Sequence, residues 1–148
     1  MLLVKLLAEG ARAPEVAHPG EDLGYDVFAL EAVELWARSS VRVRTGIAVE
    51  ARHPQSGDGP GVGLGLLVRD RSSMASKGVA VTGGVIDAGY RGEIQILLTN
   101  LTDEAIRLNA GDKIAQMIPV PVLTGVVSVV EDLADSSRAE KGFGSSGR

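Results

Sequence analysis

The chain has 148 residues, a length suited to one domain with a hydrophobic core. Hydrophobic residues make up 45% of the sequence and aromatic residues only 3%, and the absence of cysteine excludes disulfides, thiolate nucleophiles and cysteine-ligated metals. A net charge of -4 argues against a nucleic-acid or membrane binder, and the apolar start at Met1–Leu7 is too short for a membrane span, so we expect a cytoplasmic protein.

The first half of the chain alternates short apolar runs with turn residues, which predicts β-strands rather than long helices. Strands are expected at 2–7, 24–30, 33–36, 41–49 and 64–68. Within 41–49, arginines alternate with valines, which places Arg42 and Arg44 on one solvated face. A long turn rich in proline and glycine at 53–63 precedes the last of these strands.

The second half begins with the one helix that we expect, at Arg71–Gly78, with Ser72 or Ser73 as its N-cap and Gly78 at its end. Strands are then expected at 79–81, 93–98, 106–108, 113–120 and 122–130. Many short strands separated by turns predict an all-β fold, a distorted jelly-roll barrel or sandwich with one short helix.

From Glu131 onward the sequence turns polar and rich in glycine, without apolar periodicity. We therefore expect a β domain over residues 1–137 and a flexible C-terminal arm over 138–148. The valines between 120 and 129 fit either the core or a contact between subunits.

Five polar or glycine-rich segments interrupt the β pattern. They are Gly24–Asp26, Arg71–Ser73, Gly84–Glu93, Gly111–Gln116 and the tail Gly142–Gly147. In the third segment Asp87 lies in a glycine-flanked turn and Tyr90 follows three residues later. A turn held by apolar strands can aim one carboxylate and one ring at a small ligand. Taken alone, Asp87 is better explained as a turn-capping residue.

These five segments, in this order, resemble the five motifs of the trimeric dUTPase family, the deoxyuridine triphosphate nucleotidohydrolases, over nearly the whole chain. The resemblance implies Mg²⁺-dependent hydrolysis of dUTP to dUMP and pyrophosphate, which limits uracil incorporation into DNA and supplies dUMP for dTMP synthesis. It also implies a homotrimer with shared active sites at the subunit interfaces.

The resemblance assigns Asp87 as the general base that activates the attacking water at the α-phosphorus. Tyr90 would pack against the deoxyribose, unless it is a cross-strand core aromatic. Uracil would be recognised by backbone groups around Gly84, Val85 and Ile86, because a site of fixed donors and acceptors rejects a mismatched base.

Phosphate contacts are implied for Arg71, Ser72 and Ser73, although capping alone would also explain Ser73. Gln116 would hydrogen-bond an α-phosphate oxygen, although a solvent-facing strand position explains it equally well. Asp26 would support the site and hold Mg²⁺ through water, and a structural role explains it nearly as well.

The tail places an aromatic side chain, Phe143, between glycines with no evident core to join. It is either a disordered end or a segment that a ligand orders. In the second case the Phe143 ring stacks over uracil, and backbone N–H groups and three polar side chains hold the γ-phosphate. The residues involved are Arg138, Phe143, Gly144, Ser145 and Ser146.

The sequence also departs from the family pattern. Asp70 stands where the family usually has proline, and an acid there is unfavourable beside a phosphate unless it points away or helps to hold Mg²⁺. Ser73, Ala139 and Lys141 stand where glycines are common. These changes affect affinity and tail dynamics rather than the reaction class.

Two other functions are alternatives to dUTP hydrolysis. A dCTP deaminase, or a bifunctional deaminase and dUTPase, has a serine-rich segment similar to Arg71–Gly78, but it places a catalytic glutamate after a tryptophan or similar residue in the third motif. A non-catalytic nucleotide-binding jelly roll would not need the acid at Asp87.

Overall fold

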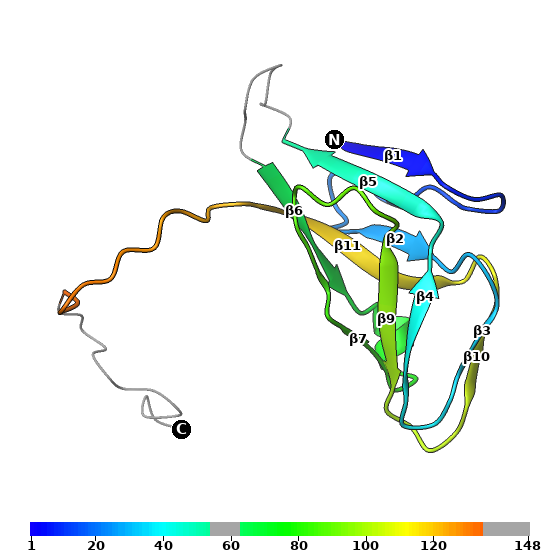
Figure 1. The fold of residues 1–148 in the computed structure, drawn as a ribbon. Helices are drawn as coiled ribbons and strands as arrows, with labels where there is room; N and C mark the ends of the chain where they lie inside the picture. Colours follow the sequence, from blue (N-terminus) through cyan, green and yellow to red (C-terminus); the bar gives the residue numbers. More distant parts are fainter. Residues whose placement is uncertain (54–62, 135–148) are drawn as a thin grey trace.

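The structure, a computed structural model, describes residues 1–53 and 63–134. Its largest sheet has six strands, all paired antiparallel (Figure 1). In spatial order they are β1 (Leu2–Leu6), β5 (Ile47–Arg52), β6 (Gly63–Arg69), β11 (Lys113–Pro121) and β2 (Tyr25–Phe28), with β8 (Val85–Ile86) also paired to β6.

Two smaller antiparallel sheets and one helix complete the described fold. The three-stranded sheet contains β4 (Ser40–Arg44), β9 (Gln95–Asn100) and β7 (Val79–Thr82), with β9 in the middle. The two-stranded sheet pairs β3 (Val33–Leu35) with β10 (Ile106–Leu108). The helix α1 (Ser72–Ala75) connects β6 to β7.

Aliphatic side chains from the large sheet and the three-stranded sheet form one core between them. Val27, Leu66 and Met117 come from the large sheet, and Val43 and Ile96 come from the three-stranded sheet. Arg42 and Arg44 alternate with Val43 and are exposed, as the sequence pattern predicts. The predicted all-β jelly-roll fold with one short helix is therefore confirmed. No helix of the described residues is long and apolar enough to cross a membrane.

The expected strand at 41–49 is two strands, β4 and β5, separated at Gly46. Gly46 has a φ of 69°, which favours glycine, and a Cβ on it would lie 2.8 Å from the Ala11 Cβ. The chain therefore turns at Gly46 and crosses from the three-stranded sheet to the large sheet, so the prediction of one continuous strand was wrong.

The expected strand at 122–130 is also wrong. β11 ends at Pro121, and residues 122–134 form an extended arm that leaves the β body (Figure 1). Its apolar side chains are exposed, with Val126 at 100% and Val129 at 96%, so these valines are not core residues. A valine-rich sequence has the propensity for a strand, but it forms one only beside a partner strand, and the described residues offer this segment none.

The predicted helix is present but shorter than expected, and its cap differs. Arg71 occupies the N-cap position and makes no side-chain capping hydrogen bond, so neither Ser72 nor Ser73 is the cap. Gly78, with a φ of 77°, donates its N–H to the Ala75 carbonyl at 2.9 Å and ends the helical turn as predicted. The long turn at 54–62 and the boundary at residue 137 lie outside the described residues.

Strand β8 lies against β6 through a close approach at Gly84. The Val68 N–H donates to the Gly84 carbonyl at 2.7 Å, and Leu66 and Leu67 then pair with Ile86 and Val85. A Cβ on Gly84 would collide with the Val68 carbonyl oxygen, a backbone atom that cannot rotate away. Only glycine therefore lets the two backbones meet here.

We predict that Gly84→Ala lowers the free energy of unfolding by about 1 to 3 kcal/mol, because the methyl group overpacks against backbone. Gly89→Ala is the matched control, since Gly89 lies in the turn on the other side of β8, has no positive φ and has no heavy atom within 4 Å of an added Cβ. Urea denaturation of both variants measures the difference. Equal stability of the two variants would contradict the close approach at Gly84.

Candidate active site

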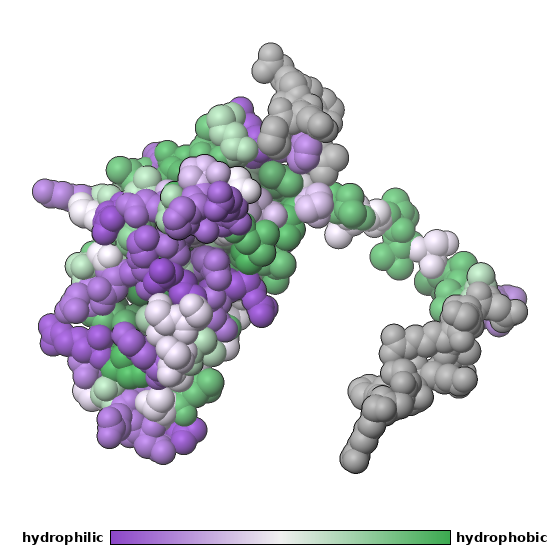
Figure 2. Space-filling view, turned by 180° about the vertical axis from the view of Figure 1, so that it is seen from behind, coloured by the Kyte–Doolittle hydropathy of each residue, from purple (hydrophilic) through white to green (hydrophobic). Residues whose placement is uncertain are grey.

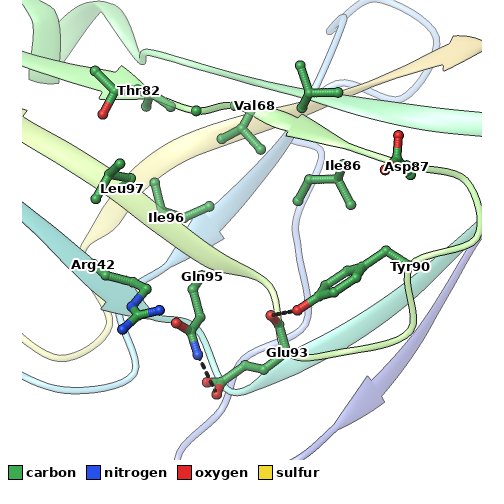
Figure 3. Close-up of a pocket in the computed structure, with 14 residues that line it drawn as sticks. Arg42, Val68, Thr82, Ile86, Asp87, Tyr90, Glu93, Gln95, Ile96 and Leu97 are labelled. Atoms are coloured by element: carbon green, nitrogen blue, oxygen red, sulfur yellow. Dashed lines mark hydrogen bonds between the residues drawn. The ribbon is translucent and has the colours of Figure 1, made fainter.

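The turn that follows β8 forms one wall of a hollow with a volume of about 390 Å³ (Figure 3). All five residues predicted for the third segment line it: Gly84, Val85, Ile86, Asp87 and Tyr90. Asp87 directly follows β8, and its side chain is exposed to solvent. Arg42 and Gln95 lie at the end of the hollow away from Asp87, on β4 and β9. The hollow thus has an acid at one end and polar groups at the other.

Hydrogen bonds to backbone groups fix the shape of the turn that carries Asp87. The Tyr90 N–H donates to the Asp87 carbonyl at 3.0 Å. The Arg91 guanidinium donates to the carbonyls of Ala88, at 2.7 Å, and Tyr90, at 2.9 Å, and it lies 3.7 Å from a carboxylate oxygen of Glu50 on β5. Arg91 therefore ties the turn to the large sheet.

The ring of Tyr90 is held at its hydroxyl and open on the side of the hollow. The hydroxyl donates to the Glu93 carbonyl at 3.1 Å (Figure 3), and the ring packs so closely on Gly92 that no Cβ fits there. Tyr90 is 47% exposed, which rules out a core aromatic. A ring fixed at both ends with one free face is suited to packing against a ligand.

Glu93 supports this arrangement from the base of the hollow. Its carboxylate accepts hydrogen bonds from the Gly46 N–H at 2.9 Å and from Arg44 Nε at 3.1 Å. Burial acts to raise the pKa of the Glu93 carboxyl, but these hydrogen bonds outweigh it and leave the pKa below its ordinary value. Glu93 is therefore an ionised anchor between the β4–β5 corner and the loop that holds Tyr90.

A second hollow, with a volume of about 310 Å³, contains four of the five other predicted residues that the structure describes. Gln116 enters it from β11, and Gly24 lies beside the Gln116 amide oxygen, which would be 3.1 Å from a Cβ at Gly24. The predicted residues that it brings together are Asp26, Arg71, Ser72 and Gln116.

Asp26 forms ion pairs with two cations, Arg71 in this second hollow and Lys113 outside its lining. One carboxylate oxygen of Asp26 is 2.8 Å from Arg71 Nε, and the other is 2.9 Å from Lys113 Nζ. The hydrogen bond to Asp26 is the main cause of a raised pKa at Lys113. Arg71 also donates from Nη1 to the Ser73 hydroxyl at 3.3 Å, and within the described residues its Nη2 has no partner. The guanidinium is thus held by one side and open on the other to an anion.

The two serines that follow Arg71 have different surroundings. Ser72 lines the second hollow, whereas Ser73 does not and accepts the hydrogen bond from Arg71 instead. Ser73 is thus placed to support Arg71, and its own contact with a ligand stays a prediction.

The donor set does not fit a metal site built from protein groups alone. In residues 1–53 and 63–134, no group of three or more histidine, aspartate or glutamate side chains is placed so that it could hold a metal ion. Asp26 has both oxygens on cations, which weakens it as a direct ligand. Mg²⁺ commonly binds one or two carboxylates together with substrate phosphates. These residues fit such a shared site better than a site made only of protein ligands.

Asp70 does not line either hollow, although it precedes Arg71. Its carboxylate accepts a hydrogen bond from the Val81 N–H, and its carbonyl accepts one from Gln116 Nε2 at 2.9 Å. The acid is therefore turned away from the phosphate-binding candidates, which removes the repulsion that its position in the sequence suggests.

The two hollows share no lining residue, so within one chain the structure does not unite Asp87 and Tyr90 with Arg71 and Gln116. The remaining candidates lie outside the described residues: Arg138, Phe143, Gly144, Ser145 and Ser146.

Sequence reasoning missed the supporting residues Glu93, Arg91 and Lys113. Glu93 contacts Arg44 and Gly46, which precede it by more than forty residues. No local pattern marks such contacts. The one available signal was that these three charged residues lie within the third and fourth segments.

Comparisons with known proteins agree with this geometry. The family model described as dUTPase matches residues 11–147. A deoxyuridine 5'-triphosphate nucleotidohydrolase of Clostridium novyi is 40% identical over 149 residues, covering 99% of this chain and 98% of the relative. The enzyme of the same name from Paramecium bursaria Chlorella virus 1 is 37% identical, covering 99% and 97%.

Solved structures lead to the same family. A mutant dUTPase of Staphylococcus bacteriophage 80alpha with dUpNHpp matches with a TM-score of 0.86 and 32% identity, covering 100% of this chain and 99% of that one. A mutant dUTPase of phage phi11 of S. aureus, described with a structural Mg(II) ion, matches with a TM-score of 0.76 and 31% identity, covering 89% and 97%. This chain belongs to the dUTPase family.

Proposed function

We propose that this protein hydrolyses dUTP to dUMP and pyrophosphate. The observation that carries the proposal is the hollow in which Asp87 and Tyr90 meet the backbone of Gly84–Ile86, in a chain that matches dUTP nucleotidohydrolases over nearly its whole length. No feature of the geometry favours dCTP deaminase activity or a purely binding role. A cytoplasmic location stays a prediction.

The uracil ring would bind along β8. Within the described residues β8 pairs with β6 only, so one edge of its backbone keeps N–H and C=O groups free for a ligand. Such groups discriminate strongly, because a base with mismatched donors leaves them buried and unpaired. The Tyr90 ring would pack on the deoxyribose and leave no space for a 2′-hydroxyl.

The reaction is a displacement at the α-phosphorus. The oxygen of water forms a bond to that phosphorus, and the bond from the phosphorus to the bridging oxygen of the β-phosphate breaks. The water proton passes to the Asp87 carboxylate, and pyrophosphate leaves with the bridging oxygen. Asp87 suits this role because it is exposed at the edge of the hollow and makes no ion pair within the described residues.

The triphosphate would be held by groups of the second hollow. Arg71 and Ser72 would contact phosphate oxygens, and Gln116 would donate an N–H to the α-phosphate. Mg²⁺, when bound to the phosphates, would neutralise charge, with Asp26 near it through water. From the tail, Phe143 would stack on uracil, and the γ-phosphate would be held by Arg138, Gly144, Ser145 and Ser146.

The separation of the two hollows supports a homotrimer with shared active sites. Residues that must meet one nucleotide lie in different hollows of one chain, so a complete site needs the first hollow of one subunit and the second hollow of another. The arm supports contacts between subunits as well, because it carries exposed apolar side chains away from the body (Figure 2). They are Val122, Leu123, Val126, Val127, Val129, Val130 and Leu133.

The substrate assignment is tested by incubating the protein with dUTP, dCTP, dTTP or UTP in the presence of Mg²⁺. We expect pyrophosphate from dUTP at least about a hundredfold faster than from the others, because one missing hydrogen-bond partner or one clash suffices for such a ratio. Ammonia release from dCTP would replace the proposal with a deaminase, and no reaction with any nucleotide would favour the binding role.

We predict that Asp87→Asn lowers kcat for dUTP by about 10² to 10⁴, because the amide cannot accept the water proton. Binding of a non-hydrolysable dUTP analogue, measured by calorimetry, should stay close to that of the parent protein. Asp103→Asn is the control, since Asp103 is an exposed acid that pairs with Arg38 away from both hollows. Loss of analogue binding in Asp87→Asn would contradict the role as a base.

Shared sites predict complementation between two inactive variants. Asp87→Asn damages the first hollow and Arg71→Ala the second, so a trimer that mixes them contains some sites with both residues intact. Coexpression with different affinity tags and purification on both should recover about a third of the parent activity, because every mixed trimer has one site out of three in which both hollows are intact. Activity no higher than that of the single variants would place each site within one chain.

A further inference from the structure

Asp70 joins three segments that carry the two hollows. It lies between the end of β6 and Arg71, and it is half-buried. Its carboxylate accepts the Val81 N–H of β7, and its carbonyl accepts Gln116 Nε2 of β11 at 2.9 Å. Val81 lines the first hollow and Gln116 lines the second. One residue thus contacts a wall of each.

The hydrogen bond between the Val81 N–H and the Asp70 carboxylate fixes the backbone of Asp70 by linking it to β7, a strand that does not pair with β6. Strand β7 lies at the edge of the three-stranded sheet and pairs with β9 alone, so an N–H on its other edge needs a partner. The Asp70 carboxylate supplies that partner, and a charged acceptor makes a stronger hydrogen bond than a neutral one. The side chain therefore tethers the start of the Arg71 turn to β7.

The bond from Gln116 fixes the orientation of its amide. An amide nitrogen carries two N–H groups, and one of them is used by the Asp70 carbonyl. The amide oxygen lies on the side of Gly24. The second N–H is left for an anion in the hollow, which is the contact proposed above for the α-phosphate.

We propose that Asp70 is a positioning residue for dUTP hydrolysis: its carboxylate holds the local backbone so that its carbonyl aims the Gln116 amide at the substrate. The inference rests on the proposed function. This role also explains why aspartate can stand at position 70, where the family usually has proline. A proline ring restricts the backbone covalently, whereas Asp70 restricts it through a hydrogen bond.

The first test compares Asp70→Ala with Asp70→Asn. Alanine removes the acceptor, so we expect kcat/KM for dUTP to fall about tenfold, whereas asparagine keeps an oxygen at the same position and should stay within about twofold. Amide hydrogen exchange gives a readout independent of activity: the Val81 N–H should exchange faster in Asp70→Ala and at the parent rate in Asp70→Asn. Equal kinetics or equal Val81 exchange in these two variants would overturn the proposal.

The second test asks whether Asp70 acts through Gln116. If it does, adding Asp70→Ala to Gln116→Ala should change kcat/KM by less than about twofold, because the side chain that Asp70 positions is already gone. A further tenfold loss in the double variant would show that Asp70 acts by another route. Should Asp70→Ala fail to fold, Asp70→Ser, whose shorter side chain does not reach Val81, replaces it in both tests.

A purely structural role is separated by a matched control. Ser39→Ala also removes one hydrogen bond from a side chain to backbone, the 2.8 Å bond to the Trp36 carbonyl, and Ser39 lines neither hollow. It should lower the melting temperature but leave kcat/KM unchanged. If the parent protein does not hydrolyse dUTP, the proposed function is wrong. If the parent protein hydrolyses dUTP but Asp70→Ala behaves like Ser39→Ala, only the proposed role of Asp70 is wrong.

Discussion

Strand β6 is the element on which both hollows depend. Along one stretch it pairs with β8, which places Gly84–Ile86 and then Asp87, and along its length it pairs with β11, which carries Gln116. At its end the chain passes directly into Asp70 and Arg71. A shift of β6 by one residue would reverse the direction of every side chain on it and would move both sets of candidates at once. The glycine at position 84 and the bond from Asp70 to Val81 lie at the points where this register is fixed.

The same strand explains why one chain carries two half-sites rather than a whole one. Asp87, which follows β8, lines the first hollow, and Gln116 on β11 lines the second. Both strands pair with β6, and the sheet keeps the two hollows apart. A second chain can bring the missing half without any change in the fold, which is the arrangement proposed for the trimer. The exposed valines of the arm are consistent with this, since an extended apolar segment gains stability only when another surface covers it.

Much of the fold was predictable because its signals are local. Alternation placed Val43 inside and Arg42 outside, and the order of five segments identified the family. The errors arose where a neighbour decides the outcome. Strand propensity at 122–130 had no partner strand in the described residues, and the capping position went to Arg71, whose guanidinium is held by Asp26 from a distant strand. The supporting role of Glu93 was not predicted for the same reason, because its carboxylate binds the N–H of Gly46, a residue distant in the sequence.

The charges of the second hollow set a requirement on how it binds a triphosphate. Its lining includes three acids, Glu15, Asp22 and Asp26, and one arginine, Arg71. The neighbouring cations Arg12 and Lys113 pair with Glu15 and Asp26 and so do not add free positive charge. Hydrogen bonds from His18 lower the pKa of Asp22, so this acid remains ionised near neutral pH. A substrate with several negative charges is therefore not neutralised by this hollow alone, and like charges close together are unfavourable. Additional cations have to come with the substrate or from another segment. Mg²⁺ on the phosphates and Arg138 of the tail would supply them. The proposed metal and the proposed role of the tail would then have the same cause, the shortage of positive charge in the second hollow.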